Sequence, residues 1–111
     1  MSRDAKKDQL LGTLDLLILR VLLSEPRHGY GIARRIEEIS KDALSVQQGS
    51  LYPALHRLEK KVFIQSEWRE GPTKKPVKVY ALTNAGKAQL EAETSHWELV
   101  SAAVNLVLKH A

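Results

Sequence analysis

Residues 63–82 have the pattern of a β-hairpin, and this segment most constrains what the chain can fold into. β-Branched and aromatic residues are frequent from Phe63 to Arg69 and from Val77 to Leu82, and the Gly/Pro-rich stretch Glu70 to Pro76 lies between them. The other regular patterns in the chain are helical. Because a lone hairpin is at best marginally stable in water, the neighbouring helices must supply its packing partner.

Three helices are predicted before the hairpin. The first runs from Gln9 to Ser24 with a wide apolar stripe, which predicts burial on more than one side, and Glu25-Pro26 ends it. The second begins near Tyr30 after His28-Gly29. The third opens between Ser45 and Ser50. Ser45 and Gln48 have the spacing of a capping box, while Gln47 and Ser50 are alternative caps.

A long helix is predicted after the hairpin, with Thr83 as its cap and an end near Lys109. Its apolar residues recur at alternating spacings of four and three, and Val100, Leu106 and Val107 widen the stripe. No later segment of this sequence can cover that stripe, so we expect a second copy of the chain to do so. The predicted dimer contacts are Leu10, Leu14, Leu90, Trp97, Val100, Val104 and Leu108.

The predicted fold is therefore mainly α with a small β-hairpin, a winged helix-turn-helix plus a C-terminal dimerisation helix. We divide it into a winged-helix domain, residues 1–82, and a dimerisation helix, residues 83–111. The chain has no Cys, which removes disulfides, zinc ribbons and thiol nucleophiles. No stretch is apolar enough to span a bilayer, and the charged N-terminus is unlike a signal peptide, so we expect a cytoplasmic protein with no membrane partner.

Charge is concentrated in the middle of the sequence. The net charge is +4, and residues 45–82 alone carry seven bases against three acids. A basic segment favours a polyanionic partner, although a solvated basic face would have the same composition.

The third helix and the hairpin turn carry the candidate DNA contacts. A helical wheel gives a buried stripe of Leu51, Leu55, Leu58 and Val62, opposite a face that is small at its start and basic at its end. Such a face suits the major groove, and flexible lysines at the hairpin turn suit phosphate. Solvated helix charge and protective edge charge are the alternatives. The candidate residues are Tyr30, Gln47, Gln48, Ser50, Tyr52, Pro53, His56, Arg57, Lys60, Lys74, Lys75 and Lys78. The wheel also leaves open that Tyr52 flanks the core.

Three motifs resemble the PadR family of bacterial transcriptional regulators. They are H-G-Y-G-I at residues 28–32, G-S-L-Y-P-A-L-H-R-L-E at residues 49–59 and Y-A-L-T-N-A-G at residues 80–86. The resemblance covers the chain from about Leu10 to its end and is closest to the family's short branch. It implies a winged helix, a dimer formed through the C-terminal helix, and repression relieved by a small effector.

Two departures from the family pattern concern the hairpin. Val62 stands where the family usually has a glycine that caps the helix, so the junction to the first strand is expected to differ in shape. Pro72 and Pro76 stand in a turn where members more often have a run of bases, which puts the reach of the wing in question but not its charge.

Trp97 matches the place at which some drug-responsive members of the short branch stack planar ligands. It therefore implies a small hydrophobic or aromatic effector. Its position on the apolar stripe favours the simpler interpretation, in which Trp97 packs in the dimer core.

Catalytic, metal and cofactor sites are not expected. The four histidines are scattered without metal-ligand spacing, and Ser50 and His56 have no third group to orient the imidazole. We therefore predict a regulator that binds double-stranded DNA as a homodimer, most simply a repressor on an inverted-repeat operator. The alternative is a winged-helix module that binds protein.

Overall fold

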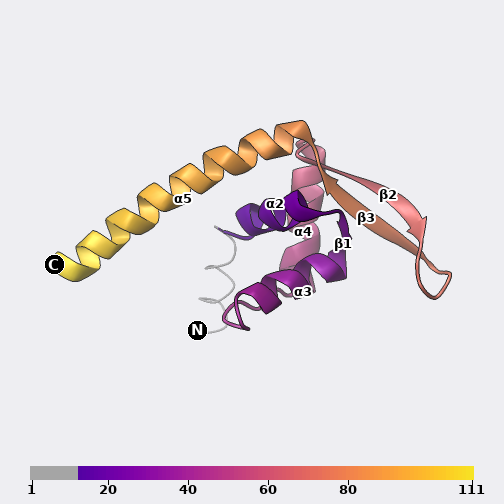
Figure 1. Ribbon diagram of the computed structural model, residues 1–111, viewed down its shortest axis with the longest axis horizontal. Helices are drawn as coiled ribbons and strands as arrows, with labels where there is room; N and C mark the ends of the chain where they lie inside the picture. The colour runs from indigo at the N-terminus through magenta and orange to yellow at the C-terminus, as the bar shows by residue number, and fades with distance from the viewer. Residues whose placement is uncertain (1–12) are drawn as a thin grey trace.

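The computed structural model describes residues 13–111, as four helices and a small antiparallel sheet (Figure 1). The elements are α2 (Leu14–Ser24), β1 (Arg27–His28), α3 (Gly29–Ile39), α4 (Gln48–Lys60), β2 (Ile64–Glu70), β3 (Pro76–Leu82) and α5 (Asn84–His110). Helices α2, α3 and α4 pack together beside the hairpin, and α5 runs away from them (Figure 1). The predicted class, mainly helical with a winged helix-turn-helix, is confirmed.

The sheet contains one strand more than the sequence predicted. Its order is β1-β3-β2, and the two residues of β1 pair antiparallel with β3 through Arg27↔Tyr80 and His28↔Val79. A strand of two residues has no period to detect, so β1 is defined only by its pairing with β3. It ties the connection before α3 to the wing formed by β2 and β3.

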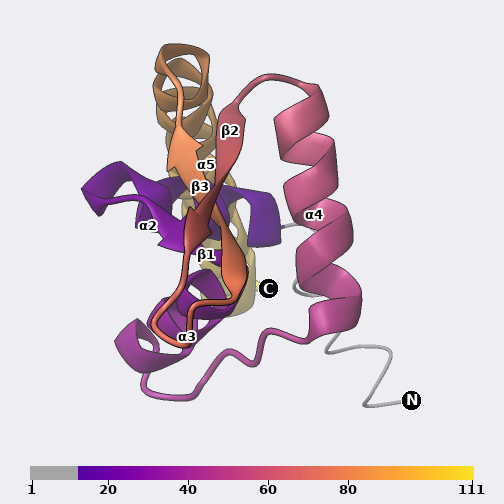
Figure 2. The same cartoon turned by 90° about the vertical axis from the view of Figure 1, so that its right-hand side faces the viewer.

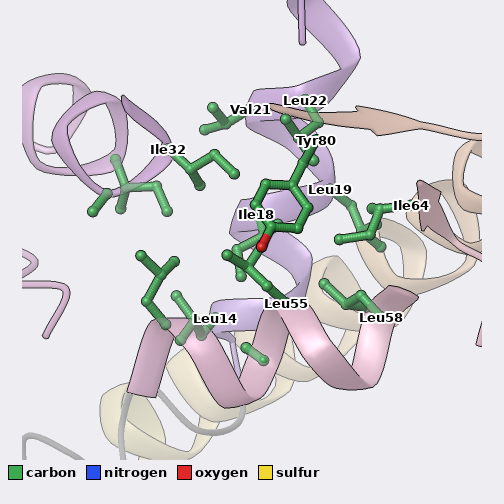
Figure 3. Packing of buried hydrophobic residues seen from close by; sticks show 14 of the residues in the cluster. Leu14, Ile18, Leu19, Val21, Leu22, Ile32, Leu55, Leu58, Ile64 and Tyr80 are labelled. Carbon is green, nitrogen blue, oxygen red and sulfur yellow. The ribbon is translucent and has the colours of Figure 1, made fainter. Parts of the chain in front are cut away.

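The core lies where α2 crosses α4 and the sheet. Ile18 and Leu19 of α2 and Ala54 of α4 are fully buried, and Tyr80 of β3 points its ring into the same cluster (Figure 3). Buried residues lie on several sides of α2, which confirms that it is enclosed on more than one side. The predicted start at Gln9 lies outside the described residues, as does Leu10.

The start of α4 differs from the capping box that its sequence suggested. Gln47 is the N-cap residue and makes no side-chain capping bond, while Ser45 lies outside the helix. Both Ser50 N–H and Leu51 N–H donate to the Gln47 carbonyl, so backbone geometry begins the helix. Pro53 lies inside α4, where it cannot donate a helical N–H bond, and the helix nevertheless continues to Lys60.

The end of α4 keeps the backbone shape of a glycine cap although the residue there is valine. Val62 has φ 63°, the left-handed region. Its N–H donates to the Glu59 carbonyl, and Phe63 N–H donates to the Leu58 carbonyl, which together form a Schellman motif. The expectation of a differently shaped junction was therefore wrong, as was the placement of Val62 in the buried stripe, since its side chain is 63% exposed.

Within residues 13–111, the contacts that anchor α5 lie at its beginning. Thr83 caps it as predicted, its hydroxyl accepting from Gly86 N–H at 3.0 Å and donating to the Val62 carbonyl at 2.7 Å. Gly86 lies so close to the backbone that an added Cβ would be 2.0 Å from the Phe63 carbonyl oxygen. Leu90 is the last buried residue of the helix, and the remaining turns extend beyond the body (Figure 1).

Candidate nucleic-acid interface

Helix α4 divides cleanly into an inner and an outer face. Leu51, Ala54, Leu55 and Leu58 are buried against the rest of the core. Gln47, Gln48, Pro53, His56 and Lys60 are exposed, and Ser50 is partly buried. The described part of the chain therefore leaves most of the predicted DNA-reading side of this helix open to a partner.

The beginning of α3 adjoins the beginning of α4 and widens this surface. The Tyr52 ring lies over Gly29, where a Cβ would stand 3.1 Å from the tyrosine hydroxyl, so glycine permits this close approach. Tyr52 is nevertheless 46% exposed, so it both packs on a neighbour and faces outward. Tyr30 is exposed and lies parallel to the His28 ring, whose Nδ1 accepts from Gly31 N–H and caps α3.

Arg34 belongs to the same surface, although it is not among the candidate residues predicted from the sequence. It lines a hollow of about 250 Å³ together with Tyr30, Gln48 and Tyr52. No ion pair engages its guanidinium within residues 13–111. The available signal was its position four residues after Tyr30, which places both on one helix face.

The wing turn presents two bases that are not engaged within the described chain. Gly71 N–H donates to the Lys75 carbonyl at 2.8 Å and Lys74 N–H donates to the Gly71 carbonyl, which closes the turn. Lys74 has φ 66°, and both lysine side chains are exposed. The wing projects away from the helices (Figure 1), and in the view along it α4 lies to one side (Figure 2), so a partner on that side could contact both α4 and the turn lysines.

Two of the predicted phosphate contacts already have acidic partners. Arg57 Nη2 lies 2.9 Å from Asp15 Oδ1 of α2, and Lys78 Nζ lies 3.6 Å from Glu59 Oε1. Glu59 also accepts a short hydrogen bond from the Ser66 hydroxyl, so it joins α4 to both strands of the wing. Arg57 and Lys78 remain predicted phosphate contacts, but each would have to leave a carboxylate to bind a phosphate.

Tyr80 lies at the base of the wing and has a perturbed ionisation. Burial raises the pKa of its phenol, and the negative charge of Glu59 and the neighbouring Tyr52 raise it further. The Lys78 ammonium lies 5.7 Å from the centre of the same ring. The phenol therefore stays neutral at ordinary pH and serves as a core side chain.

The predicted dimer contacts separate into two groups. Leu14 and Leu90 are 1% and 6% exposed within the protomer, so they belong to its own core and the prediction of a direct contact is corrected. Trp97, Val100, Val104 and Leu108 are all exposed. Leu99 and Leu106 are also exposed, and at 100° per residue both lie about opposite Trp97, so Leu106 does not widen the stripe as predicted. The outer part of α5 is thus apolar on two sides.

Comparison with known proteins assigns the chain to a family. The model of the transcriptional regulator PadR-like family matches residues 18–92, from α2 into the anchored turns of α5. The chain belongs to the PadR-like family. PadR-like proteins are transcriptional regulators and not enzymes, so the family membership supports a DNA-binding regulator.

Relatives and solved structures agree with this assignment. The chain is 30% identical over 104 residues to uncharacterized protein X of Lysinibacillus sphaericus, covering 94% of this chain and 95% of that protein. A PadR family transcriptional regulator from Eggerthella lenta has a TM-score of 0.80 and 28% identity, covering 100% of this chain and 91% of that one. A PadR-like transcriptional regulator from Bacillus cereus has a TM-score of 0.78 and 29% identity, covering 94% and 99%.

The described residues contain neither a helix long and apolar enough to cross a membrane nor a cluster of three His, Asp or Glu side chains suited to a metal ion.

Proposed function

We propose that this PadR-like chain is a homodimeric repressor that binds an inverted-repeat operator through α4 and the wing. The observation that carries the proposal is the open surface formed by the outer face of α4, the adjoining start of α3 and the unpaired lysines of the wing turn. Polar side chains at the start of α4 suit base edges, and Lys60, Lys74 and Lys75 suit phosphates.

The dimer is proposed from the exposed apolar surface of α5. From Trp97 to Leu108 seven large apolar side chains are exposed on the protomer, and such a cluster marks a contact surface. Because apolar residues lie on two sides of the helix, one partner helix would leave part of the surface uncovered. We infer that α5 of one protomer packs between α5 and a second element of its partner.

The two parts of the chain differ in their proposed function, but they share one hydrophobic core. We assign DNA binding to the chain up to residue 82 and dimerisation to the helix from residue 83. The first turns of α5 nevertheless pack against the winged helix through Gly86 and Leu90. This rigid connection supports a dimer that fixes the distance between two α4 helices, about 34 Å for half-sites one DNA turn apart.

An effector is proposed only for the assembled dimer. Trp97 is 48% exposed on the protomer, and two-fold pairing of α5 would bring two such rings toward one another. That arrangement suits a planar hydrophobic or aromatic ligand. If Trp97 is purely a packing residue, ligand binding should be absent while dimerisation persists.

A binding titration tests the proposed function. Fluorescence anisotropy of labelled duplexes from the upstream region of the protein's own gene should show saturable binding, with random duplex bound much more weakly. Retention on no genomic fragment would overturn the assignment and favour a protein-binding module.

The reading of bases is tested separately by Gln48→Ala. This change removes an exposed amide at the start of α4, so it should alter preference among operator variants more than affinity for random DNA. Equal losses on specific and random duplexes would remove Gln48 from the base-reading set.

A further inference from the structure

The inner face of the wing continues beyond the core as an aromatic groove. It has a volume of about 650 Å³ and lies between the start of α3, α4 and the wing turn. Side chains on β2 alternate between the two faces of the sheet, so Trp68 shares the face of the buried Ile64 and of Ser66, which bonds to α4. The groove is lined chiefly by Trp68, Tyr30, Tyr52, Pro72, Pro76 and Tyr80.

The groove exposes an unusual amount of aromatic surface. Trp68 is 67% exposed and Tyr30 is 62% exposed, although aromatic side chains normally gain free energy by burial. The fold does not require an indole at this point, because the core is already closed by Ile64 and Tyr80. An exposed apolar patch of this kind marks a contact surface.

The composition of the groove limits the chemistry of its occupant. No carboxylate lines it, and its only lysine, Lys78, is paired with Glu59 behind it. The two unpaired lysines of the wing turn, Lys74 and Lys75, lie between Pro72 and Pro76, which line the end of the groove. A suitable partner therefore has apolar surface that fits against rings and negative charge displaced toward the wing tip.

The sugar–phosphate strand of duplex DNA has this alternation. Deoxyribose presents C–H surface, and each sugar is followed by a phosphate. If α4 lies in the major groove, both strands of the backbone border that groove, and the strand on the side of the wing would pass between α4 and the wing. The aromatic groove lies along this path, because Tyr52 of α4 and Trp68 of the wing both line it.

We propose that the aromatic groove holds one sugar–phosphate strand of the operator and that Trp68 packs against its deoxyribose. This inference rests on the proposed function, since it requires α4 to bind the major groove. Trp68 then contributes affinity that does not depend on sequence, and the neighbouring lysines contribute the charge-dependent part.

The test compares Trp68→Ala with Gln65→Ala. Gln65 is exposed on the same strand but three residues away, so it faces the other side of the sheet. Trp68→Ala should weaken binding of operator and random duplex alike, by about five- to tenfold, because partial burial of an indole is lost. The salt slope should remain unchanged, since no counterion is released by an apolar contact. Gln65→Ala should bind as the unaltered protein does.

Tryptophan emission gives a second readout. It reports contact at Trp68 in the unaltered protein, so it does not depend on whether Trp68→Ala folds. The chain has two tryptophans, so the signal that disappears in Trp68→Phe belongs to Trp68. On addition of duplex DNA this signal should change and become protected from acrylamide, at the same DNA concentration that saturates the anisotropy.

The outcomes separate the two proposals. If anisotropy shows tight operator binding while Trp68 emission and acrylamide access stay constant, the groove assignment is wrong. The proposed function as a DNA-binding regulator then still stands. The groove assignment is also wrong if Trp68→Ala alters operator preference or flattens the salt slope. No anisotropy change with any duplex overturns both.

Discussion

At the scale of single residues, Val62 shows how a backbone shape can persist after the residue that suits it has been replaced. A β-branched side chain is costly at positive φ, yet Val62 has φ 63° and the Schellman bonds are complete. The neighbourhood enforces this geometry. The Val62 carbonyl accepts from the Thr83 hydroxyl, and Thr83 N–H donates to the Phe63 carbonyl. The junction is therefore held by the start of α5 as well as by α4.

Relief of this strain should stabilise the protein. Val62→Gly is expected to raise the free energy of unfolding by about 1 kcal/mol, because glycine adopts this conformation without the Cβ penalty and the exposed side chain loses little burial. Urea denaturation at fixed protein concentration measures it. Lys61→Gly is the matched control and should destabilise, since Lys61 has φ −82°. An unchanged or lower midpoint for Val62→Gly would show that the valine is not strained.

Tyr80 gives a pH-dependent prediction at the same scale. The pKa of its phenol is raised above its ordinary value of 10.0, chiefly by burial, so the fold favours the neutral form. This contribution to stability is present below pH 10 and is lost as the pH rises through the folded-state pKa. Tyr80→Phe should therefore lose less stability between about pH 8 and pH 11 than the unaltered protein, as measured by urea midpoints. Parallel losses in the two proteins would mean that other groups cause the alkaline effect.

At the scale of elements, the wing is joined to α4 by Glu59 and carries its unpaired charge at the turn. Glu59 contacts Ser66 of β2 and Lys78 of β3, whereas Lys74 and Lys75 have no acidic partner among residues 13–111. Wing lysines that the sequence alone does not distinguish thus have different electrostatic surroundings. Of the three wing lysines, Lys74 and Lys75 can neutralise a phosphate without breaking an ion pair described here, whereas Lys78 would have to leave Glu59.

This difference predicts unequal effects on DNA binding. Lys75→Ala should weaken binding to all duplexes and flatten the salt slope by about one unit. Lys78→Met should flatten it by less, because the Glu59 carboxylate, 3.6 Å away, already competes with phosphate for this ammonium. Lys87→Ala is the charge control, since Lys87 is an exposed base on α5. A slope for Lys75→Ala equal to that of the control would exclude the wing turn from the interface.

At the scale of the whole molecule, α5 extends well beyond the turns that pack against the winged helix. The helix has 27 residues, and its buried side chains end at Leu90. In the proposed dimer a partner covers the surface that is apolar on two sides, and anchoring through Thr83 and Gly86 would transmit the partner's position to the winged helix. Dimerisation and operator spacing are therefore expected to depend on the same helix.

A single charge in the stripe tests that dependence. Val104→Asp should convert the dimer to monomer at micromolar concentration and abolish operator binding, because a buried carboxylate without a partner is costly. Light scattering gives the mass, and anisotropy gives the binding. Asn105→Asp adds the same charge at an exposed polar residue one position away and should leave both unchanged. If the unaltered protein already has the mass of one chain, the dimer proposal is wrong.

Features set by local pattern could be predicted from the sequence. The order of helices and hairpin, the enclosed first helix, the Thr83 cap and the inner face of α4 depend on periodicity and on contacts between near neighbours in the chain. The G-S-L-Y-P motif pointed to the family that the comparison confirmed. These properties are expressed within a few turns of helix, so a linear sequence contains them.

The tertiary structure decided which side chains are engaged and which are open. Arg57 is paired with Asp15, 42 residues away, and Leu14 and Leu90 close one core from opposite ends of the chain. Strand β1 exists only through its pairing with β3, and the aromatic groove exists only because Trp68 faces α3 and α4. The partner of each such group is chosen by the packing of separate elements, because burial and charge compensation are properties of neighbours in space.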